Sequence, residues 1–415
     1  MSTLNHTLDL PVPVAAHAHR WKVLSIGVAA NTSFSAAAAG IPTTAVWLRS
    51  GYHLSNPELG ALLGAIGLGL ALSELPWGML TDRLGERPVL IGGLLGTAVT
   101  LLAMTLFLVP SPHHVPSLIW LMGAMTFTGV LGGSVNGASG RAVMAWFAEG
   151  ERGLAMSIRQ TAVPLGGGIG ALLLPFLAAH YGFAAVYGAL AVMCAASALF
   201  AARWLHQPPG TPITSHAAAA PIRHRPTVSP LRDAQIWRVV MGIGILCGPQ
   251  FALLTFGTVF LHDFARSGMA MITTTMVSLQ VGAMVMRIWS GRFTDRHGNR
   301  RAYMRASTVV AAVSFFTLAS SLLLPVPPVL IAIEVAIVGI CISAWHGVAY
   351  TELATLAGAG RAGTALGMVN TGVYAGLFLV PLTIPHILAA TSWSTVWGLA
   401  GLCSLIAYPL FPRHK

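Results

Sequence analysis

Long apolar stretches alternate with short polar gaps along almost the whole chain of 415 residues. Each stretch has about 20 residues or more, the length that an α-helix needs to cross the hydrocarbon core of a bilayer. The pattern therefore predicts an all-α membrane protein with twelve transmembrane helices. Their expected ranges are 22–48, 55–80, 88–110, 116–147, 153–179, 183–204, 236–262, 268–293, 302–324, 328–352, 362–388 and 392–411.

The composition supports this prediction. Hydrophobic residues make up 55% of the chain and charged residues only 8%, whereas soluble domains carry about 25% charged residues. A water-soluble protein of this size could not cover its surface with so few charges. We therefore expect the chain to be surrounded by the lipid bilayer. The four cysteines lie singly in apolar stretches and are expected to be free thiols.

The basic residues are distributed unevenly between the gaps. The formal net charge is +11, yet the gaps after the odd-numbered stretches contain only Arg49 and Arg266. Most other arginines lie in the remaining gaps and near the termini, which predicts that these gaps and both termini are cytoplasmic. Nucleic-acid binding would need a basic face on a polar domain, and none is present.

The chain contains an internal duplication. The segment "GMLTDRLGER" begins at Gly78 and "GRFTDRHGNRR" begins at Gly291, an offset of 213 residues. A Pro-, Ala- and His-rich segment, 206–234, separates the two copies and is expected to be a cytoplasmic linker. We therefore predict two pseudo-symmetric six-helix bundles, 1–205 and 235–415, with a binding site between them.

The duplicated segment resembles the signature loop of the major facilitator superfamily. The resemblance covers the chain as a whole, with twelve helices, a central linker and a doubled loop. It implies a secondary transporter that works by alternating access, without a cofactor and as a monomer, and it implies that the loops form a cytoplasmic gate. The residues that match are Gly78, Asp82, Arg83, Gly85 and Arg87, and Gly291, Asp295, Arg296, Gly298 and Arg301.

The residue types in these loops suit a gate. Gly78 and Gly291 would let a neighbouring helix approach closely, and Gly85 and Gly298 would permit a tight turn. The aspartates lie at helix ends, where they can pair with arginine or with the N-terminus of a neighbouring helix. A loop made basic only by its cytoplasmic location would not need glycine and aspartate at the same positions in both copies.

Charged residues inside the predicted spans are the main candidates for the binding site, because such residues are costly in lipid. Glu74 and Arg287 are equivalent in the duplication, each four residues before the motif glycine. The arrangement around Arg287 resembles small-anion transporters of the superfamily, which implies that Arg287 binds the substrate with help from Gln280, two turns earlier. The alternative is that Arg287 only extends to the membrane interface.

Two further arginines enter apolar stretches. Arg159 could join Arg287 in a doubly basic site, or it could pair with Glu149 or Glu151 near the start of its helix. Arg141 is a weaker candidate for substrate binding, and a structural pair with a glutamate is the alternative. Neutral hydrogen bonds to a substrate are expected from Asn31, Asn370 and Tyr374.

Glu74 is the expected site of proton coupling, because a carboxyl group in the membrane can take up and release a proton as access alternates. The alternative is a permanent ion pair with an arginine. Glu334 and His346 are secondary candidates for the same role.

Together these features predict a multi-pass protein of a cell membrane, by composition a bacterial inner membrane. Its expected function is proton-coupled transport of a small organic anion such as a carboxylate. The alternative is a proton-driven exporter of drugs or amphipathic compounds, because Pro164, Gly167 and Gly168 match part of an exporter motif although Val163 replaces its leading glycine. No catalytic or metal-binding sequence motif points to an enzyme.

Overall fold

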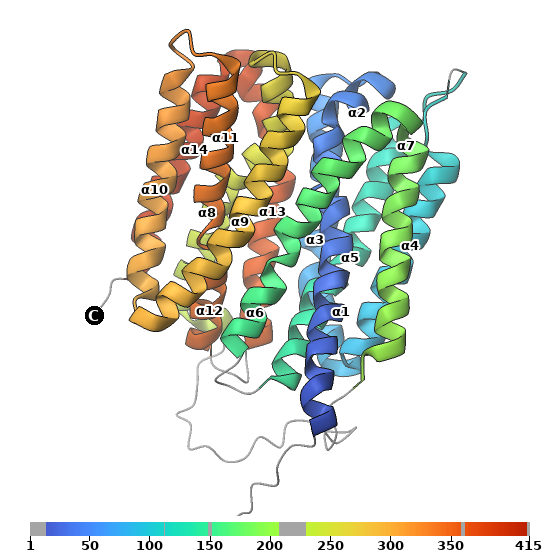
Figure 1. Cartoon of the computed structure of the whole chain (residues 1–415), viewed down its shortest axis with the longest axis vertical. Coiled ribbons are helices and arrows are strands. Elements are labelled where there is room, and N and C mark those ends of the chain that lie inside the picture. The colour runs from blue at the N-terminus through green and yellow to red at the C-terminus, as the bar shows by residue number, and fades with distance from the viewer. Residues whose placement is uncertain (1–13, 112, 148–151, 207–229, 358–361, 413–415) are drawn as a thin grey trace, which may run out of the picture.

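The computed structural model describes residues 14–111, 113–147, 152–206, 230–357 and 362–412. In these residues every element of regular structure is helical, and Figure 1 shows the helices side by side in one bundle. The side chains of a few further residues, Asp82 among them, lie outside the described part. The predicted linker 206–234 is described only at its two ends.

Each predicted apolar stretch overlaps a helix, but the stretches 22–48, 153–179 and 328–352 are each interrupted within their range. The first half of the chain forms α1 (Val14–Ala38), η1 (Ile41–Thr44), α2 (Ala45–Gly51), α3 (Asn56–Leu84), α4 (Glu86–Phe107), α5 (Leu118–Trp146), α6 (Arg152–Gln160) and α7 (Ala162–Trp204). The second half forms η2 (Pro230–Arg232), α8 (Ala234–Val259), η3 (Phe260–Phe264), α9 (Met269–His297), α10 (Arg300–Ser321), α11 (Pro328–Ser343), α12 (His346–Ala357), α13 (Ala362–Ala390), α14 (Trp393–Ala407) and η5 (Tyr408–Leu410).

Eleven helical stretches in the described residues are long and apolar enough to cross a membrane. The longest, Leu154–Trp204, has 51 residues and would measure about 76 Å if it were straight, far more than the roughly 30 Å of a hydrocarbon core. Gly182 interrupts it with φ 72° and ψ −175°, a backbone conformation that is not helical. Glycine adopts this conformation without the steric penalty of a Cβ atom.

The two halves of the chain meet along α3 and α13. Three glycines on one face of α3, Gly60, Gly64 and Gly67, lie against the backbone and side chains of α13 so closely that a Cβ atom at any of them would overlap Pro381, Leu377 or Phe378. Small residues at this spacing allow two helix backbones to come together. A second contact between the halves joins α7 and α9.

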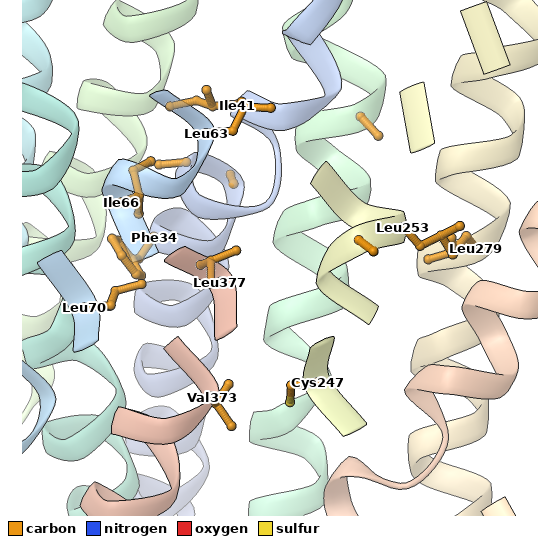
Figure 2. Close-up of a cluster of buried hydrophobic side chains, with 14 of the residues drawn as sticks. Phe34, Ile41, Leu63, Ile66, Leu70, Cys247, Leu253, Leu279, Val373 and Leu377 are labelled. Carbon is orange, nitrogen blue, oxygen red and sulfur yellow. The ribbon is translucent and has the colours of Figure 1, made fainter. Parts of the chain in front are cut away.

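Buried apolar side chains from both halves form one continuous cluster. Figure 2 shows part of it, with Ile66 and Leu70 of α3 on one side and Leu253 and Leu279 of the second half on the other. Around this core the outward-facing side chains are also apolar, for example Leu106 and Ile119, each exposed to more than 60%. A bundle that is apolar both inside and outside is expected for a protein whose solvent is lipid.

An ion pair joins the halves at the end of the bundle that carries α2 (Figure 1). Arg49 of α2 donates from Nη1 and Nη2 to the two carboxylate oxygens of Asp263 in η3, over 2.6 and 3.0 Å. Nη1 of Arg49 also donates to Asn56 over 3.1 Å, and Nδ1 of His262 lies 2.7 Å from Asp263. The charge pattern along the sequence did not predict this pair.

Candidate functional site

Polar and charged side chains from both halves meet in the middle of the apolar bundle. We call them the central cluster. Its members are Glu74 (α3), Asn136 (α5), Arg159 (α6), Arg287 (α9), Tyr350 (α12), Asn370 and Tyr374 (α13).

Glu74 lies where the two halves touch, and only 3% of it is exposed. Its carboxylate accepts hydrogen bonds from the side-chain amide of Asn136 over 2.8 Å and from that of Asn370 over 3.2 Å. Asn136 belongs to the same half as Glu74, whereas Asn370 belongs to the other. The acid is therefore bonded to both halves by neutral groups, and a direct ion pair with an arginine, the alternative predicted for Glu74, is not formed among the described residues.

Arg159 is the last arginine of α6 and is held entirely by the first half. Its Nε donates to Ser139 over 3.0 Å, and its Nη2 donates to the backbone carbonyl of Asn136 over 2.7 Å and to Asn31 over 3.5 Å. Asn31 in turn donates to Ser139 over 2.7 Å. Asn31, expected to bind substrate, thus holds the arginine in place. Among the described residues all three partners of Arg159 are neutral, and no acid bonds its buried charge. Glu149 and Glu151, the alternative partners predicted from the sequence, lie outside the described residues.

Arg287 is buried as well, with 2% of its surface exposed. Its Nη1 donates to the backbone carbonyl of Gln160 in the other half over 2.9 Å, while its Nε has no hydrogen-bond partner in the described residues. The side chain therefore points into the bundle, in contrast to the alternative in which it reaches the membrane interface.

Proline explains why the carbonyl of Gln160 is available. In a continuous helix the amide of residue 164 would donate to this carbonyl, but Pro164 has no N–H group. The helix is interrupted at Thr161, between α6 and α7. The carbonyl is left without its helical partner, and Arg287 donates to it instead.

The second half contributes an aromatic side to the cluster. The helix breaks between α11 and α12, next to Trp345 and His346, whose rings stack with centroids 4.0 Å apart. One turn later Tyr350 donates to Oδ1 of Asn370 over 2.8 Å. Tyr374 accepts from Asn136 over 2.6 Å. His346, a secondary candidate for proton coupling, is therefore a neighbour of the cluster but has no hydrogen bond to Glu74.

Gln280 lies two turns before Arg287 and is 5% exposed. It packs against α7, where a Cβ atom at Gly167 would overlap its amide, with the amide carbon only 2.9 Å away. Gly167 and Gln280 belong to different halves, so this contact is part of the α7–α9 interface. Gly167 belongs to the segment that matches part of an exporter motif. Here it allows α7 to pack against Gln280 of α9.

The charges in the central cluster do not balance. Arg159 and Arg287 contribute two positive charges, and Glu74 is the one acid among the described residues that bonds within the cluster. One excess positive charge remains when Glu74 is ionised and two when it is protonated. Burying an uncompensated charge is costly, and an anion that accepts hydrogen bonds from a guanidinium would offset that cost.

A comparison with protein families identifies the fold. A sequence model of the family described as Major Facilitator Superfamily matches residues 26–381, and again 267–415. The chain belongs to the Major Facilitator Superfamily. Its members are transporters, so the chain is a multi-pass membrane transporter of small molecules and not an enzyme.

Individual members of the superfamily are similar to this chain over different lengths. An MFS-type transporter of Mycobacterium tuberculosis is 29% identical over 403 residues, covering 95% of this chain and 85% of that protein. A glycerol-3-phosphate transporter of Bacillus subtilis is 32% identical, but only over 115 residues, 28% of this chain and 25% of its own. The crystal structure of a D-xylose–proton symporter has the same fold, with a TM-score of 0.73 at 15% identity, covering 94% of this chain and 98% of the other.

The two superfamily loops form the expected turns. Gly85 lies between α3 and α4 with φ 85°, and Gly298 ends α9 with φ 63°. Both values lie in the left-handed region that glycine tolerates best. These two glycines therefore have the backbone role predicted from the sequence.

The charged residues of the loops pair mainly within their own half. Asp295 accepts from Arg300 over 2.8 Å, and Arg301 bonds Glu352 of α12 over 2.7 Å. Arg87 donates to the carbonyl of Ala202 over 2.8 Å. Arg83 and Arg296 are exposed, and the side chain of Asp82 lies outside the described residues. A gating role for this group stays a prediction.

The two motif glycines differ in their surroundings. A Cβ atom at Gly291 would lie 3.1 Å from Ser157 of α6, so a helix of the other half does approach here. A Cβ atom at Gly78 would meet nothing within 4 Å, but a Cβ atom at Gly137 of α5 would lie 3.8 Å from the Cα atom of Gly78. The helix that approaches Gly78 therefore belongs to the same half and does not lie in the direction of an added side chain.

Two predicted site residues lie away from the central cluster. Arg141 donates to the carbonyl of Thr81 over 2.8 Å, and its Nε lies 3.6 Å from Glu86. It therefore forms the pair with a glutamate that was the alternative to substrate binding. Glu334 accepts from Ser321 over 2.6 Å at the end of α10 and bonds no member of the cluster.

Proposed function

We propose that this chain is a proton-coupled carrier of a small organic anion. The observation that supports this most directly is the pair of buried arginines, Arg159 and Arg287, whose hydrogen-bond partners among the described residues are all neutral. The carboxylate of a substrate would complete their hydrogen bonding, because a guanidinium presents several donors in a plane that matches a carboxylate. The partial similarity to a glycerol-3-phosphate transporter, whose named substrate is an anion, is consistent with this proposal.

In this mechanism the substrate lies between the halves, bonded to Arg287 and Arg159. Gln280 borders the site from α9. Glu74 takes up a proton when the cluster is open to one side of the membrane and releases it on the other, and this change biases the rocking of the halves. Asn370 and Tyr374 belong to the coupling network around Glu74.

We further propose the arrangement in the membrane. The break at Gly182 divides Leu154–Trp204 into two crossings, so the chain has twelve. The arginine-rich loops and both termini then lie in the cytoplasm, and α2 with η3 lies outside it. The membrane in question is the inner membrane of a bacterium, because the full-length similarity is to a bacterial transporter.

A thermal-shift titration of the purified protein tests the anion proposal. The panel sets mono- and dicarboxylates and organic phosphates against lipophilic cations. We expect stabilisation by one class of anion. Arg287→Gln should weaken its binding by about 30- to 1000-fold, which corresponds to about 2–4 kcal/mol for the loss of a buried charge-assisted contact.

Arg292→Gln is the matched control, because Arg292 is on the same helix but exposed. It should leave the affinity unchanged. Wild-type affinity in Arg287→Gln, with the protein folded, would refute the role of this arginine.

The exporter function is the second candidate, and one observation favours it. Asn136 joins Glu74 to Tyr374, and Asn370 joins Glu74 to Tyr350, and an acid near aromatic rings suits a lipophilic cation. Stabilisation by lipophilic cations that is lost in Glu74→Gln and kept in Arg287→Gln would support a carrier of such cations instead.

A further inference from the structure

The hydrogen bonds around Glu74 form a chain that runs from one half of the protein to the other. Tyr350 donates to Asn370, Asn370 donates to Glu74, Asn136 donates to Glu74, and Asn136 also donates to Tyr374. Glu74 is the only ionisable acid in this chain of described residues. Its protonation state therefore decides whether all four bonds can exist together.

A deprotonated carboxylate is only an acceptor, so both of its oxygens can receive amide protons. The two N–H groups of Asn136 are already committed, one to Glu74 and one to Tyr374. The oxygen of Asn370 is committed to Tyr350. When Glu74 takes up a proton on the oxygen that faces Asn370, its hydroxyl group competes with the amide donor of Asn370. Whether or not the amide turns, its bond is then to a neutral carboxyl group and loses the charge assistance that a carboxylate gives.

Of the two hydrogen bonds that Glu74 accepts, the structure indicates that the one from Asn370 is the one to break when the halves move. Glu74 and Asn136 are on α3 and α5, which pack together within the first half, and their bond of 2.8 Å can persist while the half moves as a body. Asn370 is on α13 of the other half, and its bond is longer, 3.2 Å. Asn370 is therefore the partner of Glu74 that moves with the second half when the halves rock.

We propose that Asn136 and Asn370 are positioning residues that convert the ionisation of Glu74 into a link between the halves. Asn136 fixes the carboxylate, and Asn370 holds the second half more strongly while Glu74 is deprotonated, because its bond is then charge-assisted. In this structure the link and the Arg49–Asp263 ion pair are formed together. The deprotonated protein is therefore held in the conformation that is closed at the α2 end, and proton uptake releases it. This inference rests on the proposed proton coupling.

Other charged and titratable groups act on Glu74 from every neighbouring helix. Arg159 of α6 is the nearest charge, since it bonds the backbone of Asn136. Tyr350 and Tyr374 contribute from α12 and α13. Arg287 and His346 lie further along the cluster on α9 and α12. The two arginines are cationic throughout the range tested below, so a response between pH 5 and 8 comes from Glu74, from His346, or from His262, which contacts Asp263 at the α2 end. A Glu74→Gln variant separates Glu74 from the two histidines.

The test measures the distance between the halves as a function of pH, without a substrate. Spin labels are attached to cysteines introduced at Ser50 and Ala270, exposed positions near the α2 end of each half, in a full-length chain whose four own cysteines are replaced. Pulsed electron–electron resonance then gives the distance distribution from pH 5 to 8. In the otherwise unmodified chain we expect a short distance at high pH and a longer one at low pH.

Three variants decide the outcome. Glu74→Gln should give the low-pH distribution throughout. Asn370→Ala removes one donor to the carboxylate and should move the midpoint upwards by about one pH unit, since a hydrogen bond of about 1 kcal/mol corresponds to roughly that shift. Tyr350→Phe keeps the helix packing, frees Asn370 to turn, and should move the midpoint in the same direction by less. Gln235→Ala, which removes an exposed amide on α8, is the matched control.

The possible results separate this inference from the proposed function. If Asn370→Ala and Tyr350→Phe both keep the unmodified midpoint while Glu74→Gln abolishes the response, proton coupling stands and the role of the amides is refuted. If the unmodified chain shows no response between pH 5 and 8, proton coupling at Glu74 itself is refuted. Folding of each variant is checked by its elution as a single species in detergent.

Discussion

The ion pair between Arg49 and Asp263 is expected to set how often the α2 end of the protein opens. Two hydrogen bonds of 2.6 and 3.0 Å form it, and its side chains are 25% and 33% exposed. Because the pair is partly in contact with solvent, its contribution is that of a well-aligned surface pair, about 1 kcal/mol. Among the described residues it is the one ion pair between acidic and basic side chains that joins the halves, so its loss should favour the open form about fivefold.

Cys247 provides the assay. It lies halfway along α8 and is completely buried, and Figure 2 shows it among the core side chains. In whole cells, a chain that keeps only this cysteine is treated with a membrane-impermeant maleimide. Arg49→Gln should raise the labelling rate about fivefold, whereas Arg49→Lys, which keeps the charge, should raise it less. The exchange Arg49→Asp with Asp263→Arg should restore a rate near the original one.

Two results would contradict this reasoning. An unchanged labelling rate in Arg49→Gln would mean that the pair does not control opening at this end. A rate in the exchanged pair as high as in the single variants would mean that the contact depends on the particular side chains and not on their attraction. Labelling of all variants only after the membrane is permeabilised would place the α2 end in the cytoplasm and refute the proposed orientation.

Two further substitutions test the construction of the site. Pro164→Ala restores an amide that can bond the carbonyl of Gln160, so it should remove the partner of Arg287. Anion binding, measured by calorimetric titration, should weaken by about tenfold, the cost of roughly one hydrogen bond to a charged group. Unchanged affinity would mean that the carbonyl does not position Arg287. Gly167→Val should overlap Gln280 and lower the melting temperature by several degrees through overpacking, while Gly92→Val, where an added Cβ meets nothing within 4 Å, should leave it unchanged.

The positions of the helices and the duplication could be predicted from the sequence, because both follow from patterns along the chain: the hydropathy of consecutive residues and a repeated motif. The apolar stretches predicted where the helices lie but not their interruptions at 39–44, at Thr161 and at 344–345, and the offset of 213 related Gly78 to Gly291. It also singled out Glu74, Arg159 and Arg287, since a charge within an apolar stretch is conspicuous. Hydropathy alone could not indicate which of these charges meet.

The members of the site that the sequence did not reveal are neutral or act through the backbone. Asn136 lies in the small, polar run "SVNGASG" and Tyr350 one turn after His346, but nothing in either pattern says that the side chain faces an acid. The carbonyl of Gln160 has no side-chain signal, although Pro164 four residues later is one that could have been used. The pair Arg49 and Asp263 is separated by 214 residues, and contacts between the halves leave no periodic pattern.

Glu74 and Arg287 occupy the same position in the two copies of the repeat, yet they carry opposite charges. An association of two identical six-helix chains would have to place the same residue at both positions, because a two-fold interface presents each side chain twice. Two glutamates or two arginines would then repel each other in the middle of the membrane. Joining the copies in one chain removed that restriction and allowed an acid that can exchange a proton to evolve opposite a permanent cation. The covalent fusion of the halves thus allows a buried acid and a buried arginine to occupy equivalent positions.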